Sequence, residues 1–398
     1  MKKTFNIQNV GCLRRMLDCQ RHEDLLIKNG WKKVIRIEDA CLIIISTCSY
    51  SDEKEDYTID ILLEIKKRIT KGSQLVITGC SAVFKNALNS NNISDDDIKI
   101  IKSEEELESI IESEISMNEI PDCNHFKLRP FSLRYSFKRI FNPFDTPAKY
   151  RGFHIFLSML NKSFFPKKYF FLRVSNGCLG ECSYCIIKKS IGSLKSKSAD
   201  TVLKEYEKGV GSGYKEFVLL GDDTGAYGTD IGTNLTELIH KMMKKNDNHK
   251  FHIIELNINW YIKMKDEFNK LIDSGKIKGI HFCVQSGNQK ILKLMNRYSD
   301  IEKIRESLIS LNKKHPGLRK SIDLIAGFPG ETYDDFQDSV NLAKDAGFND
   351  VWLFPYSERK GTPATMLKGK IEKEVIQERV KFFYQKVKCS NSYFPFFR

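Results

Sequence analysis

The sequence predicts an α/β protein in which an N-terminal open parallel sheet is followed by a partial (β/α)6 barrel. Apolar runs typical of buried strands alternate with helical patterns along most of the 398 residues, and this alternation favours parallel sheets covered by helices. The length suits two or three domains with cores of their own. We expect a first domain at 1–120, a linker or insertion at 121–168, the barrel at 169–372, and a C-terminal helix and tail at 373–398.

The first domain contains three apolar runs with helical patterns between them. An acidic helical stretch follows at 103–117. This order predicts a Rossmann-like open sheet, in which the carboxyl ends of the strands share one edge and sites form in the crevice there. The expected strands are Thr4–Val10, Cys41–Ser46 and Gln74–Thr78, and the expected helices are Arg14–Lys28 and Asp60–Ile69.

The barrel is predicted from six further strand-like runs, the first five of which are each followed by a helical pattern. Six such units in this length fit an open (β/α)6 barrel better than a closed eight-stranded one. A last amphipathic helix is expected at Lys373–Lys388. The expected strands are Tyr169–Ser175, Phe217–Gly221, Phe251–Ile258, Gly279–Val284, Lys320–Gly327 and Asp350–Tyr356.

The composition is that of an ordinary globular chain, with 41% hydrophobic and 29% charged residues, but the net charge is +13. Residues 124–168 hold ten Lys or Arg against one acid, Asp145, interleaved with aromatic residues. This segment suits an anionic partner, or else its aromatics pack as core and its cations are solvated. No secretory signal and no run of about 20 apolar residues is present, so we expect a cytoplasmic protein with no membrane partner.

Three of the eleven cysteines lie close together in the sequence, in Asn176-Gly177-Cys178-Leu179-Gly180-Glu181-Cys182-Ser183-Tyr184-Cys185. They follow the first predicted barrel strand. Three thiolates at this spacing can hold three irons of a [4Fe–4S] cluster and leave the fourth iron open to chelate S-adenosylmethionine (SAM). A zinc knuckle would need a second Cys or His pair, and none follows at a suitable distance.

Three other cysteines are far apart in the sequence but stand at equivalent places. Cys12, Cys48 and Cys80 each come just past the end of a predicted strand of the first domain. Because those ends share one edge of the sheet, the three thiols are predicted to converge on a second metal cluster. The alternative is that each is a small buried hydrophobe, as single cysteines often are.

Together these features resemble the methylthiotransferase family of radical SAM enzymes. The resemblance spans nearly the whole chain, and the stretch from Asp223 to Leu235 is most similar to the enzymes that modify threonylcarbamoyladenosine in tRNA. The motifs that carry it are Gly11-Cys12, Thr47-Cys48-Ser49, Gly79-Cys80, the Cys178–Cys185 loop, Asp223-Thr224-Gly225-Ala226-Tyr227-Gly228, Gln285-Ser286-Gly287, Met295-Asn296-Arg297, Gly327-Phe328-Pro329-Gly330-Glu331-Thr332 and Lys360-Gly361-Thr362-Pro363-Ala364.

The resemblance implies two [4Fe–4S] clusters, SAM as cofactor, and an electron donor such as flavodoxin or ferredoxin. The cluster on Cys178, Cys182 and Cys185 would reduce SAM to a 5′-deoxyadenosyl radical that abstracts hydrogen. The cluster on Cys12, Cys48 and Cys80 would supply the sulfur. The family pattern also implies a set of cofactor-binding residues, Tyr184, Asp223, Gln285, Ser286, Arg297, Gly327 and Pro329.

Three features depart from the family pattern. Ile191-Gly192 replaces an Arg-Gly pair, Cys283 replaces a proline, and the chain ends about where relatives carry an RNA-binding β-barrel. We therefore expect the sulfur acceptor to be a peptide or protein side chain, with a modified adenosine in tRNA as the alternative. A third hypothesis is a non-catalytic iron–sulfur or nucleic-acid-binding protein.

Overall fold

The computed structural model describes residues 3–48, 52–80, 98–101, 104–124, 169–246, 248–348 and 350–387. The first part of the chain forms an open, all-parallel sheet with the strand order β2-β1-β3-β4-β5. Its strands are β1 Thr4–Asn9, β2 Lys32–Lys33, β3 Leu42–Thr47, β4 Gln74–Gly79 and β5 Ile98–Ile100.

Helices cover both faces of this sheet. One face carries Phe5, Ile7, Leu25 and Leu26 in a single apolar cluster, and the other carries a cluster that includes Ile43. Strand β3 is buried at every position, as expected for a central parallel strand with both faces covered. The helical elements are α1 Leu13–Lys28, η1 Ile37–Asp39, α2 Asp52–Arg68, α4 Glu104–Ile111 and η4 Met117–Glu119.

The second part of the chain forms a six-stranded parallel sheet with the order β13-β12-β11-β10-β9-β6. The chain runs across it from one edge to the other, so β6 and β13 stand at opposite edges of this described sheet. This is the predicted partial (β/α)6 barrel, and the prediction is confirmed. Its strands are β6 Tyr169–Arg173, β9 Glu216–Leu220, β10 Lys250–Asn257, β11 Ile277–Gln285, β12 Arg319–Ala326 and β13 Asp350–Pro355, with a small antiparallel pair β7 Ser175–Asn176 and β8 Lys195–Ser196.

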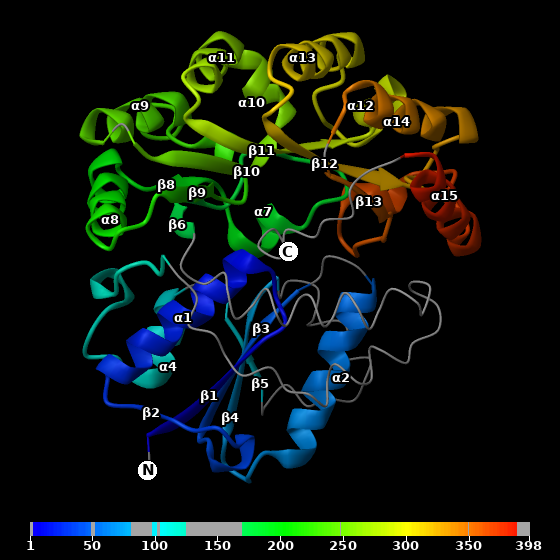
Figure 1. Cartoon of the computed structure of the whole chain (residues 1–398). Coiled ribbons are helices and arrows are strands. Elements are labelled where there is room, and N and C mark those ends of the chain that lie inside the picture. Colours follow the sequence, from blue (N-terminus) through cyan, green and yellow to red (C-terminus); the bar gives the residue numbers. More distant parts are fainter. Residues whose placement is uncertain are drawn as a thin grey trace.

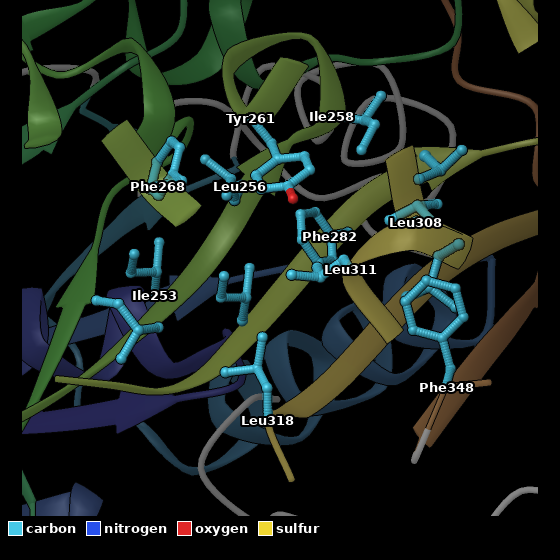
Figure 2. Close-up of a cluster of buried hydrophobic side chains, with 14 of the residues drawn as sticks. Ile253, Leu256, Ile258, Tyr261, Phe268, Phe282, Leu308, Leu311, Leu318 and Phe348 are labelled. Atoms are coloured by element: carbon cyan, nitrogen blue, oxygen red, sulfur yellow. The ribbon is translucent and has the colours of Figure 1, made fainter. Parts of the chain in front are cut away.

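Most of the helices that follow these strands lie on the side of the sheet away from the first domain (Figure 1). Figure 2 shows part of the apolar layer between sheet and helices, where Ile253 and Phe282 meet Tyr261, Phe268 and Leu308. The elements are α7 Ile187–Ile191, α8 Ala199–Gly211, η5 Thr224–Ala226, α9 Leu235–Lys245, α10 Ile258–Lys263, α11 Lys265–Asp273, α12 Gln289–Leu294, α13 Ile301–Lys314, α14 Tyr333–Asp345, η6 Pro363–Met366 and α15 Lys373–Lys386.

Side-chain caps start many of these helices. The residue before the first turn is Ser198 in α8, Asn234 in α9, Asn288 in α12, Asp300 in α13 and Thr332 in α14, and each side chain accepts a backbone N–H from that turn. Such caps satisfy N–H groups that have no partner inside the helix and stabilise it by about 1 kcal/mol each. The strand-to-helix loops of the barrel therefore have fixed starting points.

The first domain covers the opposite side of the barrel sheet (Figure 1). Leu17 of α1 packs with Tyr169, Phe171, Val218 and Ile254 of the barrel strands in one buried cluster. We call this side of the sheet its inner face. Helix α1 thus belongs to both domains, because its residues Cys19, Leu25 and Leu26 pack in the first domain.

Several elements differ from the sequence predictions, among them the short strands β2 and β8, which were not predicted. Helix α2 begins at Asp52 and not at Asp60; its polar first turns carry acidic residues, which favour a helix N-terminus but give no apolar stripe. The short edge strand β5 was not predicted. The acidic stretch is not one helix, because α4 ends at Ile111 and a separate turn follows at Met117–Glu119. No helix in the described ranges is long and apolar enough to span a membrane.

Candidate active site

The loop with Cys178, Cys182 and Cys185 follows β6 and β7 and leads into α7. Gly177 begins it with φ 73°, and a Cβ there would lie 2.2 Å from the carbonyl oxygen of Ser193. At Gly180 a Cβ would lie 3.3 Å from Cys178 Sγ. A side chain at Gly177 would clash with the backbone of Ser193, and one at Gly180 would press on Cys178 Sγ, so both positions suit glycine.

Each of the three sulfurs accepts an N–H donor. Gly180 N donates to Cys178 Sγ at 3.2 Å, Ile187 N to Cys185 Sγ at 3.5 Å, and Arg297 Nη1 to Cys182 Sγ at 3.3 Å. Burial raises the pKa of the Cys178 and Cys185 thiols to about 12. Buried thiolates therefore need a cation, and the donors around these sulfurs fit the anionic ligands of an iron–sulfur cluster.

Cys12, Cys48 and Cys80 stand at one edge of the first sheet. Cys12 is the N-cap residue of α1, while Cys48 directly follows β3 and Cys80 directly follows β4. The strand register places Asn9 beside Ser46 and Thr47 beside Gly79. The sheet thus brings these three residues to neighbouring strand ends, as the sequence predicted.

The two cysteine sets lie on facing sides of the contact between the domains. The rise in the pKa of Cys185 comes first from burial, and nearby cysteines, including Cys80 of the first domain, add to it. Cys80 is therefore near enough to Cys185 to interact with it electrostatically.

Asp222, in the loop after β9, connects the two sets. Its Oδ2 accepts the backbone N–H of Gly177 at 2.9 Å, at the start of the cysteine loop. Its Oδ1 pairs with Arg14 Nε at 3.1 Å and lies 3.7 Å from Arg15 Nη2, and both arginines follow Cys12 at the start of α1. Removing one charged partner from such a buried network lowers the free energy of unfolding by about 3–5 kcal/mol.

Arg297 donates hydrogen bonds to four groups in and around the cysteine loop. Besides Cys182, it donates to the Tyr184 hydroxyl at 3.2 Å, to Asn257 Oδ1 at 2.9 Å and to the Cys283 carbonyl. The Tyr184 ring lies edge-on to Phe328, with ring centroids 6.2 Å apart. The structure therefore brings Tyr184 and Arg297 together with the turn that holds Gly327 and Pro329.

Asp223 is buried beside Cys178. Its Oδ2 accepts the Trp260 indole N–H at 3.0 Å, whereas its Oδ1 is buried without a hydrogen-bond partner among the described residues. Burial raises the pKa of this carboxyl to about 6. An unpaired buried acceptor is costly, so this site fits a ligand that brings hydroxyl or ammonium donors, as SAM does.

Gly327 and the Gln285–Ser286 pair have mainly backbone roles. Gly327 has φ 83°, and its N–H donates to Glu331 Oε2 at 2.7 Å. Gln285 ends β11 with φ 81°, at a register shift against β12. The Ser286 hydroxyl is fully buried and accepts the Asn288 N–H at 3.2 Å, so it is used within the protein.

Sequence reasoning missed several polar residues that the fold brings to this region. Asp222 had a signal, because it stands beside Asp223 at the end of a strand. Arg14 had none, since an arginine in a helical pattern usually faces solvent. A group of four on the inner face, Glu255, His281, Cys283 and Asp323, also went unrecognised, although Cys283 had been noted as a departure.

Two protein-family models match the chain. The radical SAM superfamily matches residues 172–343, and the uncharacterized protein family UPF0004 matches residues 4–99. Together they cover more than half of the sequence and leave out the segment between the two domains. The first-domain match ends within β5, and the radical SAM match runs from β6 into α14, short of β13.

Relatives over most of the chain carry methylthiotransferase names. A probable threonylcarbamoyladenosine tRNA methylthiotransferase of Pyrococcus horikoshii is 28% identical, covering 95% of this chain and 82% of that protein. The ribosomal protein uS12 methylthiotransferase RimO of Chlamydia pneumoniae is 28% identical, covering 96% and 77%. The chain belongs to the radical SAM methylthiotransferase family. A tRNA-2-methylthio-N(6)-dimethylallyladenosine synthase of Clostridium perfringens is also 28% identical, covering 95% and 80%.

Solved structures with the same fold come from other branches of radical SAM chemistry. The radical SAM methyltransferase TsrM of Kitasatospora setae, with cobalamin and a [4Fe–4S] cluster bound, superposes with a TM-score of 0.61 at 12% identity, covering 92% of this chain and 77% of that one. The cobalamin-dependent enzyme OxsB reaches 0.52 at 12% identity, covering 97% and 56%. These likenesses support the arrangement of an open sheet before a partial barrel.

The enzyme is a radical SAM methylthiotransferase that uses SAM and [4Fe–4S] clusters. The donor sets described above fit these groups. The loop cysteines offer three sulfurs with N–H donors around them, and Asp223 offers a buried acceptor that the protein leaves unpaired.

Proposed function

We propose that the enzyme attaches sulfur or a methylthio group to an unactivated carbon, with one cluster on Cys178, Cys182 and Cys185 and a second on Cys12, Cys48 and Cys80. The observation that carries this proposal is that Asp222 joins the two three-thiol sets: it accepts the N–H of Gly177, next to Cys178, and pairs with Arg14, two residues after Cys12. One set follows the first barrel strand, and the other stands at the carboxyl edge of the first sheet. A carbon activated beside the first set would lie within reach of sulfur held at the second.

When bound, the loop cluster supplies the electron that converts SAM to a 5′-deoxyadenosyl radical, and the other cluster supplies sulfur. The protein's part is to bind and orient. Arg297 holds Cys182 and Tyr184 in one arrangement through its planar guanidinium, and Asp223 offers its free oxygen to a SAM hydroxyl or ammonium group. Asp222 fixes the loop to α1, so that the two sulfur sites keep one separation.

We propose a peptide or protein side chain as the sulfur acceptor, as the name of the RimO relatives states for those proteins. Of the net charge of +13, residues 124–168 contribute +9, so the rest of the chain has only a small excess of cations. RNA affinity depends on many cation–phosphate contacts. The rest of the chain, which holds both cysteine sets, therefore suits a peptide better than a nucleic acid.

Modification of an adenosine in tRNA is the second candidate. Two observations favour it: the Pyrococcus and Clostridium relatives bear tRNA-modifying names, and residues 124–168 interleave cations with aromatics, which can stack on bases. That segment lies almost wholly outside the described residues, so this candidate depends on sequence alone.

The test is a substrate competition under anaerobic conditions. The reconstituted enzyme, SAM and a low-potential donor such as flavodoxin or ferredoxin are incubated with the host's ribosomal proteins and its unmodified tRNA together. Mass spectrometry then detects the mass of an added thiol or methylthio group on peptides and on nucleosides. We expect the addition on a peptide; addition only to a nucleoside would replace this proposal by the second candidate. Production of 5′-deoxyadenosine without added sulfur on either would contradict both.

The basic segment offers a separate check of the tRNA candidate. If RNA is the substrate, replacing Arg134, Lys138 and Arg139 by Ser should flatten the dependence of RNA affinity on salt, by about 0.7 in log–log slope for each lost contact with single-stranded RNA. We expect instead that the slope of peptide turnover against salt changes little. SAM cleavage in the absence of substrate is the control, since these residues lie outside the described cluster loop.

A further inference from the structure

The inner face of the barrel sheet carries a second group of chemistry-bearing side chains, distinct from the two cysteine sets. Glu255 lies on β10, His281 and Cys283 on β11, and Asp323 on β12, and one donor atom of each lies within 4.8 Å of the others. His281 Nε2 is 3.0 Å from Asp323 Oδ1. The Cys283 thiol donates to Glu255 Oε2 at 3.3 Å. Three adjacent strands therefore aim one imidazole, one thiol and two carboxylates at a single point.

The placement of His281 and Cys283 follows from strand alternation. Ile280, Phe282 and Val284 of β11 belong to the apolar layer under the helices, and Figure 2 shows Phe282 there. Successive side chains of a strand point to opposite faces. The two residues between them therefore share the inner face, which meets the first domain.

Glu255 reaches this face only because β10 contains a bulge. Ile253 and Leu256 both pack in the layer under the helices, although regular alternation would put them on opposite faces. The pairing with β11 shifts register between these two residues, and Glu255 has φ 56°. A bulge adds one residue and re-aims a side chain. Here it keeps a carboxylate out of the apolar layer and sets it beside Cys283.

We propose that Glu255, His281, Cys283 and Asp323 bind a zinc ion. Zinc in proteins takes cysteine sulfur, histidine nitrogen and carboxylate oxygen in four-coordinate sites. Bond lengths of about 2.0–2.3 Å place the donors of a tetrahedral site about 3.3–3.8 Å apart. The separations of 3.0 and 3.3 Å between facing donors are close to that spacing.

The surroundings suit a divalent cation. A Cys283 thiolate and the two carboxylates bring three negative charges, which one zinc ion and the Arg14 guanidinium would balance. Arg14 Nη1 holds Glu255 Oε1 at 2.8 Å, which leaves Oε2 facing Cys283. An outer partner of this kind orients a carboxylate ligand and typically contributes 10- to 100-fold to metal affinity.

The ion would be structural, because the protein fills all four positions. It would tie β10, β11 and β12 together at the point where two of these strands are bulged. Arg297 donates to the Cys283 carbonyl and to Cys182 Sγ, so the ion would also fix the support of the cysteine loop. This inference does not depend on which carbon receives sulfur.

The test is metal analysis of the full-length protein after anaerobic assembly of its clusters. The protein is incubated with Zn²⁺, and loosely bound metal is removed with a weak chelator followed by desalting. Iron and zinc are then measured by mass spectrometry. We expect about one zinc per chain besides the iron. Zinc-edge X-ray absorption should show one sulfur at about 2.3 Å and three lighter ligands at about 2.0–2.2 Å. Zinc below about a tenth of an equivalent would overturn the proposal.

Variants separate this site from the cluster cysteines. His281→Ala should lower bound zinc at least tenfold, and the milder Cys283→Ser should remove the sulfur signal while the iron content stays normal. His252→Ala is the matched control, since buried His252 on β10 also pairs with a carboxylate, Glu216, at 2.8 Å but belongs to no such group of metal-binding side chains among the described residues. A protein with Cys178, Cys182 and Cys185 changed to Ala should keep its zinc. Zinc that disappears in that triple variant, or a sulfur signal that persists in Cys283→Ser, would assign the ion to the cluster cysteines and overturn the proposal.

Discussion

The two cysteine sets differ in how the chain brings their thiols together. Cys178, Cys182 and Cys185 lie within one loop, so glycine-permitted turns and local N–H donors fix their geometry. Cys12, Cys48 and Cys80 meet only because three parallel strands end at the same edge of a sheet. The first set depends on a short stretch of backbone, whereas the second depends on the fold of a domain. Damage to the first domain should therefore affect the two sites very unequally.

The largest effect is expected from removing the local set. With Cys178, Cys182 and Cys185 all changed to Ala, cleavage of SAM should fall to background, and iron after reconstitution should drop from about eight to about four per chain. Iron analysis and the yield of 5′-deoxyadenosine measure the two effects. Full iron retention, or complete iron loss in a protein with an unchanged circular dichroism spectrum, would contradict the two-site assignment.

The next effect concerns the set that the fold assembles. Cys48→Ala should still cleave SAM, because the loop set is intact, but should add no sulfur to the substrate. The iron content should again fall by about half. The matched control is Cys19→Ala, which removes a buried thiol of α1 that stands at no strand end. Sulfur incorporation by Cys48→Ala at the wild-type rate would give that set a purely structural role.

A smaller effect should follow from loosening the link between the sets. Asp222→Asn weakens the pairing with Arg14 and Arg15 while an amide oxygen can still accept the Gly177 N–H. We expect sulfur transfer to fall about tenfold, which corresponds to about 1.4 kcal/mol in the barrier, with SAM cleavage changed less than twofold. Glu104→Gln, which removes an ion pair of Arg21 on the same helix, should leave both rates unchanged. Equal losses in both rates for Asp222→Asn would instead indicate general destabilisation.

The last effect is on stability alone and depends on pH. Burial raises the pKa of Asp223 to about 6, so the folded protein disfavours the ionised carboxylate. The resulting stability is present below pH 4, where the group is protonated in both states, and is lost as pH rises through about 6. Asp223→Asn removes this loss and should raise the free energy of unfolding of the barrel by about 2–3 kcal/mol more at pH 8 than at pH 4. Urea unfolding at both values measures it; a pH-independent difference would show that the carboxyl is already ionised without penalty.

The sequence predicted the architecture well because both sheets are parallel and buried. Strands such as β3 are continuous apolar runs whose ends carry clear turn residues, so their limits were placed within one or two residues. The sequence also predicted that Cys12, Cys48 and Cys80 follow neighbouring strand ends, and the register of β1, β3 and β4 places them there. Helix α2 was predicted to begin eight residues too late, since its first turns from Asp52 are polar and show no apolar stripe.

What the sequence did not predict depends on contacts between distant elements. The bond from Gly177 to Asp222 and the ion pairs from Asp222 to Arg14 join three separate parts of the chain. The local sequence does not reveal the role of Arg14, because an arginine in a helix can either face solvent or form a buried ion pair. Glu255 was hidden for another reason: an inserted bulge residue breaks the alternation on which strand predictions depend.

Gly177 constrains the evolution of this chain as firmly as the neighbouring thiols do. A Cβ at this position would lie 2.2 Å from the Ser193 carbonyl oxygen, and the backbone has φ 73°. No mutation at this codon other than a silent one would therefore be tolerated while the loop keeps its shape. In a survey of natural variation, Gly177 should vary as little as Cys178. Gly177 would be invariant because no side chain fits there, whereas Cys178 would be invariant because its thiol can ligate a metal. Invariance in this loop would then record steric necessity as often as chemistry.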